Sequence, residues 1–234
     1  MKCSIIPGLL MGGAMLQAAP LADELDAFSQ TAASRIPAEI RAEFARGIDA
    51  VAKSGITEKA IKVGNKAPDF TLKNAAGEEV SLKALLSKGP VVLTWYRGGW
   101  CPYCNLTLAA YQKLLPNFEK AGASIVALTP ELPDKAAETT RKNGVGFEVL
   151  TDLNHQVARR YGLVFDLTPK VAAIYKRRFD LLAYNGKDAG NASLPLAATY
   201  VIGADGVVRY AFLDADYRKR AEPSEVLNVV QGVK

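Results

Sequence analysis

The 234-residue sequence has little of the chemistry that metal sites need, with one histidine, His155, and three cysteines, Cys3, Cys101 and Cys104. A structural zinc site takes four ligands, usually cysteine and histidine. A zinc site on the two later cysteines would need two further ligands, and only one histidine is present. No metal and no organic cofactor is therefore expected.

Long apolar runs and nucleic-acid motifs are also missing. The longest apolar stretch, residues 5–19, is too short for a comfortable transmembrane helix, so no stable membrane association is predicted. The formal net charge is +5, from 29 basic and 24 acidic residues. Basic residues gather at 176–178 and 218–220. Because no nucleic-acid motif accompanies them, we interpret both groups as solvated faces and expect no nucleic-acid partner.

The first twenty residues differ from the rest of the chain. Lys2 is followed by the apolar stretch and then by the small residues Ala18 and Ala19, a pattern typical of a secretory signal peptide. Residues 1–20 are therefore expected to be removed and the protein to be periplasmic or secreted. The alternative is a cytoplasmic protein whose true start is Met11 or Met15. In both cases Cys3 is absent from the working protein.

The chain that remains divides into a helical N-terminal extension, residues 21–60, and a main domain, residues 61–234. Apolar residues repeat at helical spacing over residues 21–53, with a break at Pro37 and an end at Gly55. We expect these helices to form a lid packed on the main domain. The alternative is a module that binds a partner.

The main domain alternates predicted strands and helices, which is typical of an α/β fold. Its strands are expected at 63–72, 90–96, 124–129, 147–150, 199–203 and 207–212, and its helices at 82–86, 105–118, 138–143, 155–161, 170–182 and 225–230. Asp205-Gly206 is a hairpin turn signal, so the last two strands are antiparallel. This order predicts a mixed central β-sheet covered by helices on both faces.

Cys101 and Cys104 stand where the strand at 90–96 passes into a helix. Pro102 suits a first helical turn because its missing N–H needs no partner there. Free N–H groups and the helix dipole favour an anion at this end, so Cys101 is expected to have a depressed pKa and to be the nucleophile. Cys104 lies one turn deeper, where it can form a disulfide with an oxidised Cys101.

A static disulfide is the structural alternative for this pair. Closing so short a ring restrains little chain entropy, and such a bridge would stabilise the fold only weakly. Together with the position at a strand-to-helix junction, this favours thiol redox chemistry.

The chain resembles the peroxiredoxin-like branch of the alkyl hydroperoxide reductase and thiol-specific antioxidant family. The resemblance runs from about residue 22 to the end and rests on residues 63–70, 95–105, 198–209 and 214–223. It implies a thioredoxin-like fold and reduction of hydroperoxides, with electrons from a thioredoxin-like reductant.

The sequence departs from that family around the expected nucleophile. Peroxiredoxins carry proline seven and threonine three residues before the peroxidatic cysteine, where this chain has Thr94 and Gly98, and an arginine where it has Ala197. Arg97 is the nearest replacement, expected to lower the pKa of Cys101 without contributing to folding. The alternative is a surface arginine on a glycine-rich turn.

These features favour a thiol peroxidase that uses Cys101, Cys104 and Arg97. A protein thiol-disulfide oxidoreductase would use the same cysteines, although the position of its cis proline is Ala197, with Pro195 two residues early. The third possibility is a redox-sensing or binding module without turnover.

Overall fold

The structure, a computed structural model, describes residues 20–179, 181–186 and 192–233. The predicted signal peptide and Cys3 lie outside the described residues, apart from Pro20. The helices are α1 (Leu21–Arg35), α2 (Ala38–Lys53), α3 (Ile56–Lys59), α4 (Leu82–Leu86), α5 (Pro102–Lys120), α6 (Pro133–Asn143), the 3-10 helix Leu153–His155, α7 (Gln156–Arg160), α8 (Pro169–Phe179), α9 (Leu181–Asn185) and α10 (Pro223–Gly232). The strands are β1 (Thr71–Asn74), β2 (Glu79–Ser81), β3 (Val91–Trp95), β4 (Ser124–Thr129), β5 (Glu148–Thr151), β6 (Val164–Asp166), β7 (Ser193–Pro195), β8 (Thr199–Ile202) and β9 (Val208–Phe212).

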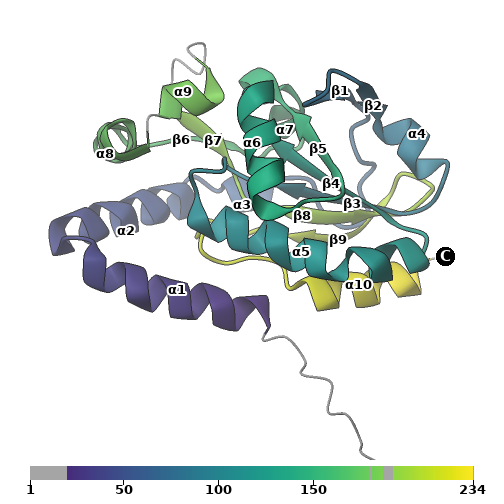
Figure 1. The fold of residues 1–234 in the computed structure, drawn as a ribbon, viewed down its shortest axis with the longest axis horizontal. Helices are drawn as coiled ribbons and strands as arrows, with labels where there is room; N and C mark the ends of the chain where they lie inside the picture. The colour runs from purple at the N-terminus through teal and green to yellow at the C-terminus, as the bar shows by residue number, and fades with distance from the viewer. Residues whose placement is uncertain (1–19, 180, 187–191, 234) are drawn as a thin grey trace, which may run out of the picture.

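The central sheet is mixed, as the sequence predicts. Its seven strands run in the order β2-β1-β5-β4-β3-β8-β9 (Figure 1). β3 pairs parallel with β4, and β4 pairs parallel with β5. The antiparallel pairs are β1 with β5, β8 with β3, and β9 with β8. The predicted hairpin turn joins β8 to β9, where Gly206 takes the positive φ of 76° that its position requires. β6 and β7 form a separate two-stranded sheet.

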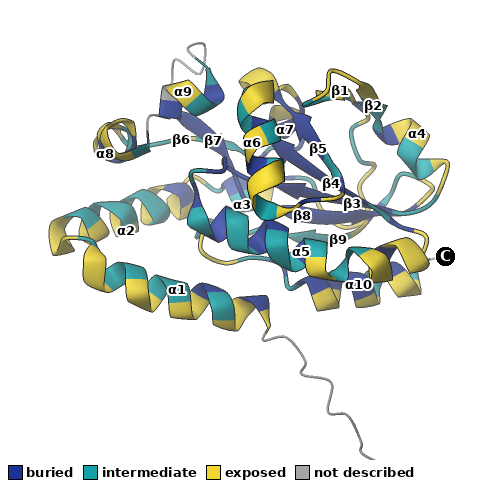
Figure 2. Ribbon diagram, in the orientation of Figure 1, coloured by how far each residue is buried: buried dark blue, intermediate teal, exposed yellow. Residues whose placement is uncertain are grey.

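Helices cover both faces of this sheet because alternate residues of each central strand point in opposite directions. In β3, Val92 packs into one apolar cluster with residues of α5 and α10, whereas Val91 and Leu93 pack into another with residues of α7. The same alternation continues in β4. The central strands are consequently buried on both sides (Figure 2).

The N-terminal helices pack on the main domain, with the predicted break at Pro37. Leu21 and Leu25 of α1 are buried in the cluster that contains α5, and Phe44 of α2 contacts Tyr175 of α8 with ring centroids 5.6 Å apart. The outer faces of both helices are exposed (Figure 2). No helix among the described residues has the length and apolar character to span a membrane.

Several predicted boundaries are wrong for local reasons. Residues 63–70 are largely irregular and β1 begins only at Thr71, since Pro68 lacks an N–H for pairing and Gly64 adopts a positive φ. The single helix predicted over 170–182 is two helices, α8 and α9. The elements α3, β6 and β7 were not predicted, because they are too short for a repeating apolar pattern to be recognised in the sequence.

Candidate active site at the start of α5

The loop between β3 and α5 depends on two glycines. At Gly99, a Cβ atom would lie 2.1 Å from Oγ1 of Thr139 on α6, closer than atoms can approach. At Gly98, φ is 144° and a Cβ atom would meet the indole of Trp100. Glycine is therefore required at both positions for the loop to pass this close to α6.

The carboxylate of Glu131 holds this loop by hydrogen bonds. Glu131 follows β4 and is fully buried. It accepts hydrogen bonds from the N–H of Gly99 at 2.8 Å, from Tyr96 Oη at 2.7 Å and from Thr139 Oγ1 at 3.1 Å. Burial raises the pKa of Glu131, and these hydrogen bonds oppose the rise. The sequence analysis missed this residue, although its position after a buried parallel strand is one where functional side chains gather.

Cys101 and Cys104 are both free thiols and both closed to solvent, with exposed fractions of 1% and 0%. Cys101 is the N-cap residue of α5 and Pro102 is the first helical residue, as predicted. Cys104 lies one turn further, and its N–H donates to the Cys101 carbonyl at 3.1 Å. Each thiol shifts the pKa of the other. The pair is thus placed to interconvert between dithiol and disulfide.

The sulfur of Cys104 lies close to two arginines. Nη2 of Arg220 lies 3.5 Å from Sγ, and the charge of buried Arg97 also acts on it. Burial by itself would raise the pKa of Cys104. The hydrogen bonds and the positive charges of Arg220 and Arg97 outweigh it and lower this pKa to about 5.

The expectation that Cys101 has the depressed pKa is wrong. Burial raises the pKa of Cys101, and its hydrogen bond to Cys104 together with the charge there raises it further. Within the described residues the Cys101 side chain makes no capping hydrogen bond to the first turn of α5, so the helix N-terminus gives its sulfur no direct donor. Of the two sulfurs, Cys104 is therefore the one whose surroundings favour a thiolate.

Arg97 is buried, with an exposed fraction of 1%, which excludes a surface arginine. Its Nη2 donates to Tyr175 Oη at 2.7 Å. The guanidinium carbon lies 5.1 Å from the Trp100 ring centroid, 5.3 Å from that of Tyr175 and 4.3 Å from that of Tyr217. Such cation–π contacts hold a charge in a desolvated place. Arg97 thus reaches both cysteines electrostatically, as predicted, but it is also part of the core.

Thr94 and Ala197, which occupy the positions of the family's proline and arginine, contribute no charge to the site. Thr94 lies in β3 with its Oγ1 3.0 Å from Oγ1 of Thr199, and Ala197 is buried between β7 and β8. His155 is also engaged elsewhere, since its Nε2 lies 3.1 Å from the Ser193 carbonyl oxygen. Among the described residues no three His, Cys, Asp or Glu side chains cluster as metal ligands would.

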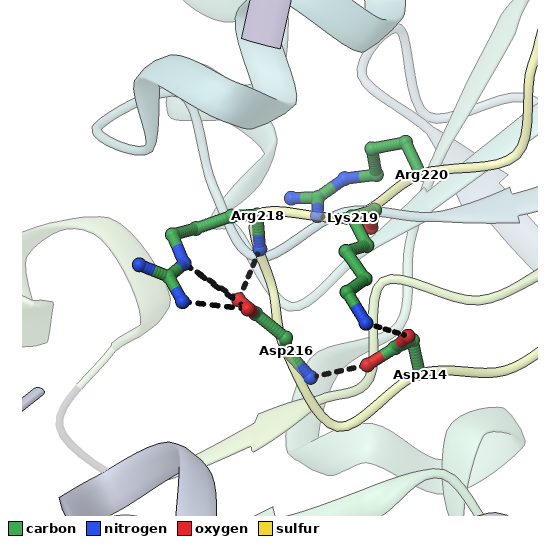
Figure 3. A network of polar contacts seen from close by, with 5 residues as sticks. All are labelled: Asp214, Asp216, Arg218, Lys219 and Arg220. Carbon is green, nitrogen blue, oxygen red and sulfur yellow. Dashed lines mark hydrogen bonds and ion pairs between the residues drawn. The ribbon is translucent and has the colours of Figure 1, made fainter. Parts of the chain in front are cut away.

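The second basic group, residues 218–220, is not simply the solvated face that the sequence suggests. Arg218 and Lys219 are exposed and pair with Asp216 and Asp214, whereas Arg220 is half-buried and turns to the active site (Figure 3). The first group, residues 176–178, is exposed as predicted. No local pattern distinguishes Arg220 from its neighbours, so its role could not be found in the sequence.

Known proteins resemble this chain in sequence and fold. The model of the AhpC/TSA family matches residues 63–211. A putative peroxiredoxin bcp of Helicobacter pylori is 30% identical over 69% of this chain and 94% of its own length. A chloroplastic peroxiredoxin Q of Triticum aestivum is 25% identical over 78% of this chain and 72% of its own length. Peroxidoxin BcpB of Mycobacterium tuberculosis shares the fold, with a TM-score of 0.58 and 22% identity over 74% of this chain and 99% of its own.

Proposed function

The chain belongs to the AhpC/TSA family and is a thiol peroxidase, and we propose that it reduces hydroperoxides through the buried pair Cys101 and Cys104. The observation that carries the proposal is the contact of an arginine with one of two buried free thiols, with Nη2 of Arg220 3.5 Å from Sγ of Cys104. Thiolate, not thiol, attacks a peroxide, and Cys104 has the environment that keeps a thiolate at neutral pH. Cys104 is therefore the attacking residue, in place of Cys101.

The first step forms a sulfenic acid on Cys104. The thiolate attacks one peroxide oxygen, the O–O bond breaks, and the other oxygen leaves as an alkoxide or hydroxide that takes a proton from solvent. Negative charge moves from sulfur to the leaving oxygen during this step. The positive charges of buried Arg97 and half-buried Arg220 favour that movement, and the charge of Arg97 is the less screened by water.

The second step closes the disulfide. The thiol of Cys101 attacks the sulfenic sulfur of Cys104, the S–S bond forms, and one water leaves with the thiol proton. The two cysteines lie one turn apart at the start of α5, so its backbone need move little. A dithiol protein of the thioredoxin type then reduces the disulfide and becomes oxidised itself.

A steady-state peroxidase assay tests this function. The mature chain, a thioredoxin system and NADPH are mixed with hydrogen peroxide or tert-butyl hydroperoxide, and NADPH loss is followed. The proposal expects turnover that depends on both peroxide and thioredoxin. Reduction of insulin disulfides without peroxide turnover would assign the pair to a protein thiol-disulfide oxidoreductase instead.

A further inference from the structure

The C-terminal loop, residues 213–222, carries three consecutive basic residues with different surroundings. Nη2 of Arg218 is 2.7 Å from Asp216, and Nζ of Lys219 is 3.2 Å from Asp214. Arg220 has no carboxylate partner in the described part of the chain and extends away from both aspartates (Figure 3). Two of the three charges are neutralised within the loop, and the third is left for the sulfur of Cys104.

We propose that Arg220 is a catalytic residue that holds the Cys104 sulfur as the attacking thiolate. The assignment rests on the thiol peroxidase function proposed above. Its basis is the contact of 3.5 Å between Nη2 of Arg220 and Sγ of Cys104, across 116 residues of sequence. A guanidinium stays charged at every working pH, so it stabilises the anion without exchanging a proton with it.

The position of Arg220 is fixed by the loop. Its Nη1 donates to the Lys219 carbonyl at 2.9 Å. The loop is anchored near its far end, where the Glu222 carboxylate accepts a hydrogen bond from the N–H of Ala22 at 3.2 Å. The Tyr217 ring lies over the Arg97 guanidinium. It also packs against the Tyr103 ring of α5, with the two ring centroids 5.6 Å apart. The loop therefore supports both arginines that act on the cysteine pair.

Arg220 also lies between the buried sulfur and the surface. Its side chain helps to line a surface hollow of about 580 Å³ between α1 and the C-terminal loop. One guanidinium nitrogen thus touches Cys104 while the residue borders the hollow, so a peroxide admitted by a local opening on this side would meet Arg220 beside the sulfur. As the O–O bond breaks, the donors released by the sulfur become available to the leaving oxygen.

Other ionisable groups act on Cys104, and a test must separate them from Arg220. They are five residues from three parts of the fold: Tyr96, Arg97 and Cys101 in the segment between β3 and α5, Glu131 after β4, and Tyr175 of α8. A comparison of single arginine variants keeps all of these unchanged. Arg218 is the matched control because it lies two residues away, is exposed and pairs with Asp216.

The experiment compares Arg220→Met, Arg220→Lys and Arg218→Met in the full chain carrying Cys101→Ser. Iodoacetamide alkylation of Cys104 is followed by peptide mass spectrometry from pH 4 to 9, and sulfenic acid formation by dimedone trapping after hydrogen peroxide is added. In the reference protein the midpoint of the alkylation profile should lie below the ordinary pKa of a cysteine thiol, because Arg220 and Arg97 keep their charges. With Arg220→Met we expect a higher midpoint, alkylation at pH 6 slowed roughly 10-fold, and sulfenic acid formation slowed roughly 10²-fold.

Arg220→Lys should restore part of the alkylation profile and part of the peroxide rate, because lysine keeps the positive charge but lacks the forked donor geometry of the guanidinium. Arg218→Met should change neither. If Arg220→Met matches Arg218→Met, or slows the peroxide reaction without moving the alkylation profile, the assignment of Arg220 is overturned. If no protein reacts with peroxide, the proposed function fails, while the alkylation profile still decides whether Arg220 holds the thiolate.

Discussion

The backbone N–H of Gly99 donates a 2.8 Å hydrogen bond to Oε1 of Glu131, which joins the loop before α5 to the end of β4. This bond lies in a fully buried place, and the same carboxylate also binds Tyr96 and Thr139. Loss of the acceptor would leave buried donors without a partner, which costs far more than an exposed hydrogen bond. Glu131 is thus a positioning residue for the loop that carries Cys101.

We predict that Glu131→Ala lowers the free energy of unfolding by about 2–4 kcal/mol, because several buried donors lose their acceptor. Urea denaturation measures the change. The matched control is Glu138→Ala on α6, whose carboxylate pairs with Lys135 at the surface at 3.0 Å. The control should change the free energy by less than about 0.5 kcal/mol. Equal effects in the two variants would show that the Glu131 carboxylate does not hold the loop.

Arg97 is expected to matter for both stability and chemistry. Arg97→Ala removes a buried charge that lies over three aromatic rings and donates to Tyr175, so the free energy of unfolding should fall by about 2–3 kcal/mol. The expectation from sequence, that folding would hardly change, does not allow for this burial. Peroxide attack should slow roughly 10²-fold. Arg97→Lys should give a free energy of unfolding and a peroxide rate between those of wild type and Arg97→Ala. Arg177→Ala, at an exposed position, should match wild type in both. Wild-type stability and rate in Arg97→Ala would contradict this role.

The N-terminal helices control access to the sulfurs. Phe28 of α1 packs edge-on against Tyr103 of α5 with ring centroids 5.1 Å apart, and both sulfurs are closed to solvent. A reagent therefore reaches them only after a local opening. Phe28→Ala should lower the opening free energy by about 1 kcal/mol and speed alkylation of Cys104 roughly 5-fold. The exposed Gln30→Ala on the same helix should leave the rate unchanged, and identical rates for the two variants would place access elsewhere.

The sequence also predicts export, for which we propose a mature N-terminus between Ala19 and Leu21. N-terminal sequencing of the protein from its native cell, combined with fractionation, measures this directly. A chain that begins at Met1, Met11 or Met15 in the cytoplasmic fraction would contradict the proposal.

The sequence predicted those parts of the structure that depend on local pattern. Continuous apolar runs located β3 and β4, and Pro102 located the start of α5 beside Cys101. Contacts between distant segments escaped prediction. Nothing near Arg220 indicates that it meets Cys104, and nothing near Glu131 indicates that it binds Gly99. For the same reason the sequence assigned the low pKa to the N-cap cysteine, since the helix terminus and Arg97 were the sources of stabilisation visible locally, and the contact of Arg220 with Cys104 was not.

A single-turnover comparison of the two cysteine variants tests the central claim most directly. Reduced wild type, Cys101→Ser and Cys104→Ser each receive one equivalent of hydrogen peroxide with dimedone present, and peptide mass spectrometry identifies the modified sulfur. We predict a Cys101–Cys104 disulfide in wild type, a dimedone adduct on Cys104 in Cys101→Ser, and no reaction in Cys104→Ser. An adduct on Cys101 in Cys104→Ser, with Cys101→Ser inert, would contradict the assignment of the attacking sulfur, and inert wild type would contradict the thiol peroxidase itself.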